Sequence, residues 1–429
     1  MKKIIFVFIL IIGLCYNSYS QITIEYCQTK AKENYPTFSN TALLEKTSKY
    51  SLSNANVNYL PQLNFFAKAT YQSDVTKIDV TLPPPLTADF IKFPEMSKDQ
   101  YQAALELSQV IWDGGYTHQK KKEIKAELES QKANLEVELY TLRDRVANLY
   151  FGILSIKQQK ALSLLMQKEL DRNVSQVQSF VESGLANESD LDLLRVEKLN
   201  LNQRITEIEL LEKSYLKMLS IMMGETLSET SNFVEPNLSL QKPSSIILRP
   251  ELMAFDSQIK ILDAKKQMIN TLSMPQLAAF AQGGYGKPAL NMFNENPDFF
   301  AIVGLRLSWN ISSFYTKRNN THQIEVNKQL LESNRSAFLF NTNLQLEGQN
   351  TEIERLEKLL EVDKQIIVLR EKIRETSEFK MENGTMSVSD YIKEVNTTDV
   401  AKQNEILHRI QLLMSIYKQN NLTNQSYEN

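Results

Sequence analysis

The chain has 429 residues and carries 48 lysines and arginines against 51 aspartates and glutamates, which gives a formal net charge of −3. This length accommodates two or three ordinary domains, or one long repeated unit. The slightly acidic balance gives no support for a nucleic-acid partner, so no binding to nucleic acid is expected.

The first 20 residues, MKKIIFVFILIIGLCYNSYS, have the organisation of a secretory signal peptide. Two lysines precede a short apolar run, and a small-x-small cleavage site precedes Gln21. The apolar run is too short to cross a bilayer as a helix. Lipidation at Cys15 is the alternative, although Leu14 is bulky where a small residue is expected before a lipidated cysteine. Cleavage before Gln21 would leave Cys27 without an intrachain disulfide partner.

After this segment, the sequence predicts a helix, two strands and two long helices. The first helix is predicted over residues 22–59, with a break at Asn34-Tyr35-Pro36 because proline disfavours helical geometry in the residue before it. Strands are predicted over about 61–74 and 99–112, where apolar and polar residues alternate. One side of the second strand carries Tyr101, Ala103, Leu105 and Leu107, and the other carries Gln102, Ala104, Glu106 and Ser108.

Two long helices follow, over about 116–183 and 186–223. The first covers about 67 residues, on the order of 100 Å at 1.5 Å per residue, which far exceeds the length of an average globular helix. Apolar residues in it alternate at spacings of four and three, which is typical of a coiled-coil seam. The first seam consists of Leu135, Leu139, Leu142, Val146, Leu149, Ile153 and Ile156, and the second of Leu191, Leu194, Leu201, Ile205 and Ile208.

The same order of elements recurs in the second half of the chain. PQL at residues 61–63 matches PQL at 275–277 with an offset of 214, and the offset becomes 200 from residue 105 onwards. The change of offset indicates an insertion in the proline-rich loop TLPPPLTADFIKFPEMSK of the first copy. The elements of the second copy are a helix over 250–272, strands over about 275–287 and 298–311, and helices over about 315–383 and 386–418.

The chain is therefore interpreted as a tandem duplication. The first repeat covers residues 21–227, the second covers 249–418, and residues 228–248 form the segment between them. The polar tail at 419–429 is predicted to be disordered.

Four amphipathic strands in one chain raise a closure problem. Each is long enough for the roughly 9–11 residues that cross a bilayer, but a sheet in lipid can have no open edges. Bacterial barrels begin at eight strands, so four strands cannot close alone. Three chains would supply twelve strands and two chains would supply eight.

Several short motifs, taken in order, resemble the TolC-like outer membrane efflux protein family, also called outer membrane factors. The motifs are ENYP (33–36), LPQL (60–63), SQVIWDGGY (108–116), RPEL (249–252), MPQL (274–277), LSW (307–309) and the paired SGLANESDL and NGTMSVSDY. The resemblance implies a mixed α and β-barrel fold. Long antiparallel coiled-coil helices would form a periplasmic α-barrel, and four strands per protomer would contribute to a trimeric twelve-stranded outer-membrane barrel, with residues 228–248 at the equator.

The family also implies partners and a location. A homotrimer in the outer-membrane lipid of a Gram-negative bacterium would dock on a periplasmic adaptor (membrane fusion) protein. It would conduct substrates passively from an inner-membrane transporter of RND or ABC type, in efflux or type I secretion. The competing interpretation is an exported coiled-coil structural or adaptor protein without a pore, which leaves the alternating strands without a role.

The family's adaptor-contact residues map to the tips of the long helices. Gly184 and Gly384 stand where one helix reverses into the next, and glycine suits such a stop because it accepts positive φ. Leu185 and Thr385 would share the contact surface. A turn glycine with no further role is compatible with the same positions.

The family's periplasmic gate maps to Asp390 and Lys393. The family has aspartates six and nine residues after the second glycine, and three copies of Asp390 around an axis would form a carboxylate ring that selects cations. Lys393 departs from this pattern, and Met381 and Met386 replace the family's aromatic and basic partners. The simpler interpretation, helix capping, applies to Ser189, Asp190 and Ser389, and also to Asp390.

Other features point to structure rather than chemistry. Asp113-Gly114-Gly115 matches the family's turn from strand to helix, whereas the second copy has Ser313-Phe314-Tyr315. The aromatic residues at the strand ends fit either interface girdles or core packing, and they are Tyr71, Tyr101, Tyr285 and Phe299. His118, His322 and His408 are scattered, and we find no metal-ligand spacing, phosphate loop or nucleophile motif. No metal, cofactor or enzymatic activity is expected.

Overall fold

The computed structural model describes residues 21–76, 96–184, 186–237, 246–292, 294 and 296–424. The predicted signal peptide, the alternative lipidation site at Cys15 and most of the proline-rich insertion lie outside these residues. The chain divides into two compact units. The helical unit comprises Met1–Thr41, Ala133–Ala254 and Arg335–Asn429, and the sheet unit comprises Ala42–Lys132 and Phe255–Asn334. Each unit takes segments from both predicted repeats, so the repeats are not the compact units.

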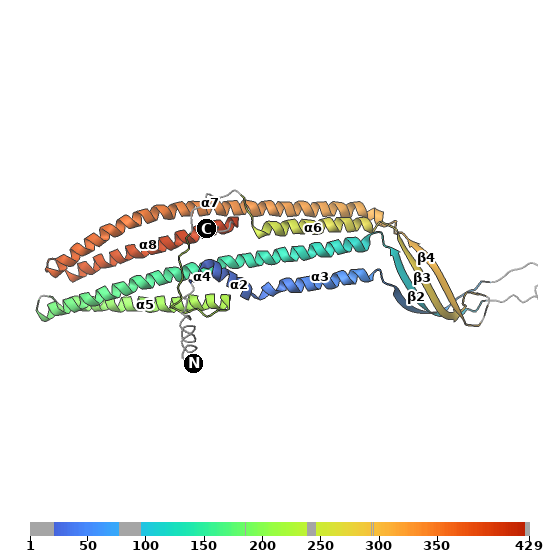
Figure 1. Ribbon diagram of the computed structural model, residues 1–429, viewed down its shortest axis with the longest axis horizontal. Helices are drawn as coiled ribbons and strands as arrows, with labels where there is room; N and C mark the ends of the chain where they lie inside the picture. Colours follow the sequence, from blue (N-terminus) through green and yellow to red (C-terminus); the bar gives the residue numbers. More distant parts are fainter. Residues whose placement is uncertain are drawn as a thin grey trace, which may run out of the picture. The chain divides into compact units, whose positions relative to one another are not determined.

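The sheet unit contains one antiparallel sheet of four strands in the order β1-β2-β3-β4 (Figure 1). The strands are β1 (Gln62–Tyr71), β2 (Asp99–Trp112), β3 (Gln276–Lys287) and β4 (Asp298–Ser308). Their register places Leu63 opposite Leu107 and Ala281 opposite Val303. Because strand side chains alternate between faces, this register collects the apolar residues on one face of the sheet.

The apolar face of the sheet is exposed. It carries Leu63, Phe65, Tyr71, Tyr101, Leu105, Leu107, Tyr285, Phe299, Val303, Leu305 and Leu307, all of which are exposed. The opposite face is more polar, and on it Arg306 donates to Glu106 Oε1 at 3.0 Å and lies over the Phe280 ring at 4.6 Å. The strand-end aromatics therefore belong to an exposed apolar face, and the rings of Tyr285 and Phe299 contact each other in a tilted arrangement with centroids 4.9 Å apart.

The two strand-to-helix turns differ between the repeats. In the first, Gly114 and Gly115 have φ of +66° and +84°. Asp113 is buried and accepts hydrogen bonds from the backbone N–H groups of Gly115 (2.9 Å) and Thr117 (2.7 Å) and from the Tyr59 hydroxyl (3.0 Å). Burial disfavours the charged form of this carboxyl, but the hydrogen bonds from Thr117, Tyr59 and Gly115 prevail and lower its pKa.

In the second repeat the same bend uses side-chain hydrogen bonds instead of glycines. The Ser312 hydroxyl donates to Asn310 Oδ1 at 2.6 Å, and the Ser313 hydroxyl donates to the Asn310 carbonyl at 2.7 Å. None of residues 310–313 has positive φ.

Four helices contribute to the sheet unit: α3 (Asn40–Val57), α4 (Tyr116–Glu182), α6 (Pro250–Thr271) and α7 (Ser313–Glu382). Within the unit α3 lies beside α4, and α6 beside α7 (Figure 1). Ion pairs join them, between Lys132 of α4 and Glu45 of α3 (2.7 Å), and between Lys266 of α6 and Glu325 of α7.

The helical unit adds α2 (Ile24–Asn34), the 3₁₀ helix η1 (Pro36–Ser39), α5 (Glu188–Met223) and α8 (Val388–Thr423). Tyr35 has extended geometry, with φ −67° and ψ 129°, because Pro36 follows it. The predicted break at residues 34–36 is thus observed between α2 and η1.

The core of the helical unit lies where α2, α4, α5 and α8 meet. Its fully buried side chains include Cys27, Val146, Tyr150, Ile153 and Leu219. All of the predicted seam residues of α4 are buried except the partly buried Leu149, and all five of those in α5 are buried. The predicted coiled-coil packing of the long helices is therefore confirmed.

The end of α8 differs from the prediction. The tail was expected to be disordered from residue 419, but α8 continues to Thr423, and Gln419, Asn420 and Thr423 are buried. These polar residues find partners: the Gln419 amide donates to Asn350 Oδ1 at 2.6 Å, and the Thr423 hydroxyl donates to the Asn420 carbonyl at 3.1 Å. Polar composition alone therefore misplaced the helix end.

Throughout the described residues, no helix combines the length and the apolar character needed to span a membrane.

Candidate functional site: the tips of the helical hairpins

The helical unit contains two helical hairpins. Hairpin one is α4 with α5, and hairpin two is α7 with α8. Gly184 and Gly384 end α4 and α7 with φ of +73° and +67°. A Cβ built on either glycine meets nothing within 4 Å, so it is the backbone conformation, not lack of space, that requires glycine.

The tip of hairpin two has the hydrogen bonds of a Schellman motif. The N–H of Gly384 donates to the Met381 carbonyl at 3.0 Å, and the N–H of Thr385 donates to the Lys380 carbonyl at 2.9 Å. The Thr385 hydroxyl also donates to the Lys380 carbonyl, at 3.0 Å. At the other tip the N–H of Gly184 donates to the Val181 carbonyl at 3.0 Å, and Leu185 lies outside the described residues.

The helix caps lie two residues earlier than the sequence predicted. Asn187 and Ser387 are the N-cap residues, and Ser189 and Ser389 stand inside the first turns of α5 and α8. The prediction that these two serines are caps is therefore wrong. The error arose because Ser189 and Ser389 are good cap residue types next to aspartates, while the helices begin one residue before each serine.

The predicted aspartates do stabilise the helix starts, but from the third helical position. Asp190 Oδ2 accepts from the backbone N–H of Asn187 at 3.3 Å. The N–H of Asp390 donates to the Ser387 hydroxyl at 3.1 Å, and that hydroxyl donates to Asp390 Oδ2 at 2.7 Å. Both carboxylates also lie at the positive end of a helix dipole.

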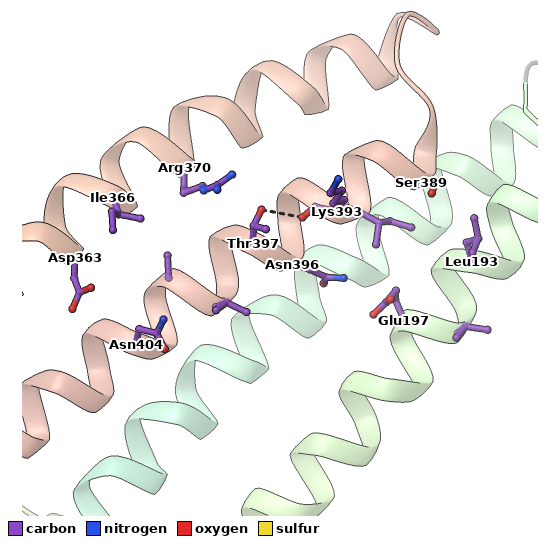
Figure 2. A pocket seen from close by; sticks show the side chains of 14 residues that line it. Leu193, Glu197, Asp363, Ile366, Arg370, Ser389, Lys393, Asn396, Thr397 and Asn404 are labelled. Atoms are coloured by element: carbon purple, nitrogen blue, oxygen red, sulfur yellow. Dashed lines mark hydrogen bonds between the residues drawn. The ribbon is translucent and has the colours of Figure 1, made fainter. Parts of the chain in front are cut away.

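Lys393, the departure from the family's second aspartate, lines a groove of about 610 Å³ between α5, α7 and α8 (Figure 2). Ser389 lines it too, whereas Asp390 is exposed one residue further on and is not part of its wall. The Lys393 carbonyl accepts from the Thr397 hydroxyl at 2.9 Å. No ion pair of Lys393 is found among the described residues.

The groove combines apolar walls with both signs of charge. Figure 2 shows Glu197 on α5, Asp363 and Arg370 on α7, and Lys393 on α8 around it. Arg370 is paired with Glu394 at 3.2 Å. Asp363 Oδ2 lies 2.6 Å from Nδ1 of His408, so this histidine joins α7 to α8.

The two hairpins are joined by a row of polar contacts that the sequence analysis missed. Arg374 of α7 donates to Glu169 Oε1 of α4 at 2.5 Å, and one turn nearer the tip Arg172 pairs with Glu378. A further turn on, the Gln176 amide donates to Glu382 Oε1 at 2.9 Å. We call these three pairs the inter-hairpin ladder.

The sequence spacing of the ladder residues is regular, but this regularity is too common to predict the pairing. Its partners are separated by 205 or 206 residues, close to the repeat offset of 200, and the α4 partners recur every three or four residues. Charged residues at that spacing are common on any exposed helix face. The pairing can therefore be identified only when the rotation of one helix relative to the other is known.

Beside the ladder, the hairpins share a small apolar core. It consists of Val177, Leu191, Leu194, Met381, Val388 and Tyr391. Met381 is 4% exposed and packs within this core. Hairpin contact here combines this core with the ladder.

No group of three or more metal-ligating side chains occurs in the part of the chain that the structure describes.

Comparisons with known proteins bear on the fold. No protein-family model and no curated protein matches this chain. Among solved structures, the outer membrane protein VceC of Vibrio cholerae aligns with a TM-score of 0.67 at 12% identity, over 94% of this chain and 97% of its own. The fold is that of TolC-like outer-membrane channels.

Two further TolC-like channels agree. The CmeC outer membrane channel of Campylobacter jejuni aligns with a TM-score of 0.64 at 13% identity, over 96% of this chain and 89% of its own. The open state of the MtrE channel of Neisseria gonorrhoeae aligns with a TM-score of 0.64 at 12% identity, over 93% and 88%. The predicted TolC-like resemblance is thereby confirmed at the level of fold.

Proposed function

We propose that this chain is one protomer of a passive exit duct in the outer membrane of a Gram-negative bacterium. The observation that carries the proposal is the two-faced sheet: one face is apolar and exposed, and the other is more polar. Such a sheet suits lipid on one side and a water-filled lumen on the other. The likeness to outer-membrane channels over more than nine-tenths of the chain supports the same role.

Assembly follows from the edges of the sheet. In the described residues, β1 and β4 each pair with one strand only, so two edges stay open. Unpaired backbone groups in lipid cost several kcal/mol each, so the sheet needs further copies to close. A homotrimer would close a barrel of twelve strands.

The tips support docking on a periplasmic adaptor. Gly184, Gly384 and Thr385 are exposed, and the Schellman bonds fix the backbone that a partner would contact. With Leu185, they form the proposed adaptor surface. The energy for transport would come from an inner-membrane transporter of RND or ABC type, so the duct itself needs no active site.

We place the periplasmic gate at Asp390 and Lys393. Asp390 is exposed at the start of α8, and Lys393 lies one turn further along in the groove. In a trimer the two residues would form adjacent rings of opposite charge, which would weaken cation selectivity relative to two carboxylate rings.

The first test is the assembly state and conductance of the detergent-extracted protein. We expect a mass of three chains by native mass spectrometry and ion channels in planar bilayers. Asp390→Ala should lower cation preference, and Lys393→Ala should raise it. A monomer that is soluble without detergent and forms no channel would support the coiled-coil structural protein instead.

Adaptor docking can be tested separately. Gly384→Trp should abolish cross-linking to the adaptor and efflux in cells while leaving the trimer and its conductance intact. Gly348→Trp is the matched control, because Gly348 also has open space around it but lies within α7, away from the tip. Equal cross-linking by both variants would contradict the docking site.

A further inference from the structure

A small cavity inside the helical unit carries a buried carboxyl that the proposed function does not use. The cavity has a volume of about 140 Å³ and lies between α4, α5 and α8. Asp399 of α8 lines it and is 5% exposed. Glu169 of α4 and Glu197 of α5 line the same cavity.

A second buried polar group lines this cavity. Asn173 is 2% exposed, and its side-chain N–H donates to the Tyr391 hydroxyl at 3.1 Å. Its Oδ1 atom has no hydrogen-bond partner within the described residues. A buried acceptor without a donor costs free energy.

Each cation near Asp399 contacts another partner, and two of these partners are carboxylates. Arg374 of α7 is bound to Glu169, Lys402 of α8 is paired with Glu371 at 3.0 Å, and Arg204 of α5 donates to Gln403. Within the described residues, Asp399 takes part in no ion pair. An ionised Asp399 would therefore be buried beside the Glu169 carboxylate without a counter-ion in contact.

We propose that Asp399 is a proton-binding site that couples pH to the packing of hairpin one against hairpin two. Glu169 connects this site directly to the inter-hairpin ladder, because its carboxylate accepts from Arg374. The same cavity wall includes Tyr391, which belongs to the apolar core that the hairpins share.

The direction of the effect follows from the pKa of this carboxyl. Burial and the neighbouring Glu169 carboxylate raise the pKa of Asp399 to about 6. A hydrated aspartate has a pKa of about 3.9, so the packed hairpins hold the proton more tightly than separated ones. Packing is therefore strengthened below pH 6 and weakened as the pH rises through it. Between pH 5 and 7.5 the packing equilibrium should change about tenfold.

The consequence for the duct rests on the proposed function. At acidic pH the two hairpins of each protomer would stay packed together. Neutral pH would loosen them and so favour an open entrance.

The test measures the distance between the hairpins in the assembled protein. Spin labels are placed on Ser179→Cys of α4 and Glu375→Cys of α7, both of which are exposed. Labelling is selective because Cys27 is fully buried, and burial raises the pKa of its thiol to about 12. We expect the distance distribution to narrow and shorten on acidification, with a midpoint near pH 6.

Asp399→Asn, which mimics the protonated side chain, should show the short distance at every pH from 5 to 7.5 and a higher unfolding midpoint than wild type at pH 7.5. Asp192→Asn is the matched control, because Asp192 pairs with Arg195 of its own helix, and it should titrate like wild type. A wild-type distance that does not change with pH would overturn the proposal, as would an Asp399→Asn variant that still titrates or fails to fold.

The contribution of His408 must be separated from that of Asp399, because His408 also joins α7 to α8, through Asp363. If His408→Gln abolishes the pH response and Asp399→Asn retains it, the proton site is His408 with Asp363, and the proposal fails. These outcomes do not depend on pore formation. A protein that conducts but shows no pH response refutes only this inference, and a pH response without conductance refutes only the exit duct.

Discussion

In the first repeat, β2 passes into α4 through two glycines with positive φ and a buried aspartate, whereas in the second repeat β4 passes into α7 through a solvent-exposed turn at residues 310–313. The two turns occupy equivalent places in the repeats, but their surroundings differ. A Cβ on Gly114 would lie 2.5 Å from the Met274 Cβ and 3.3 Å from the Pro275 carbonyl oxygen.

The comparison shows why the turn of one repeat requires glycine while the equivalent turn of the other repeat does not. The first turn packs against Met274 and Pro275, just before β3, so it has neither room for a side chain nor freedom to change φ. The second turn packs against nothing comparable, and hydroxyl groups can stabilise it. Four pairs of substitutions test contrasts of this kind, beginning with the pair that should change stability most.

Gly114→Val should destabilise the protein most, by about 3 kcal/mol, because it adds both a strained φ and an overpacked contact with Met274. Ser312→Val in the second turn should change stability by less than about 1 kcal/mol. The loss of stability is measured by thermal unfolding in detergent, with circular dichroism as the signal. Equal losses in the two variants would show that the turns are equivalent after all.

Asp113→Ala should cost about 2 kcal/mol, because the start of α4 loses its cap and the Tyr59 hydroxyl loses its acceptor. Asn310→Ala in the second turn should cost roughly half as much, since its partners are exposed hydroxyl groups that water can satisfy. Because the pKa of Asp113 is lowered, its contribution should persist at neutral pH and disappear in strong acid, below the normal aspartate range. A wild-type unfolding midpoint equal to that of Asp113→Ala at pH 7 would contradict this.

Two glycines of hairpin two allow the effect of backbone conformation on stability to be distinguished from the effect of steric crowding. Gly384→Ala should destabilise by about 1 kcal/mol because its φ is +67°, whereas Gly348→Ala, in the middle of α7, should stabilise by up to about 1 kcal/mol. Neither added methyl group has a neighbour within 4 Å. Effects of the same sign would mean that conformation is not the determinant.

Substitution of the residue that caps α8 should have the smallest effect on stability. Ser387→Ala should cost about 0.5–1 kcal/mol, because Ser387 caps α8, while Ser389→Ala should cost little. Urea unfolding of the two variants in parallel would decide between them. A larger loss for Ser389 would restore the cap that the sequence first suggested.

Much of the fold could be predicted from the sequence because its signals are local. The α4 helix begins and ends within one residue of its predicted bounds, since a long apolar seam and a terminal glycine fix both its type and its end. The strand pairs followed from alternation, and the break before Pro36 followed from proline's effect on Tyr35.

The candidate site was less predictable because it depends on how helices are rotated against one another. Glu169, Arg374 and Asp399 look like ordinary surface charges of amphipathic helices. Only packing shows that the first two pair across hairpins and that Asp399 is buried. The cap error has a different origin. Residues two positions apart were both of a suitable type, and which of them caps the helix depends on where the first helical turn begins.

The ion pair between Glu106 and Arg306 has a consequence for the duplication itself. The two residues are 200 apart, which is the offset between the repeats, so they occupy equivalent positions in the two copies. One copy supplies the acid and the other the base. A chain built from two first repeats would face one carboxylate with another, and a chain built from two second repeats would face two guanidinium groups. At this position the two halves of the protein are therefore complementary rather than interchangeable.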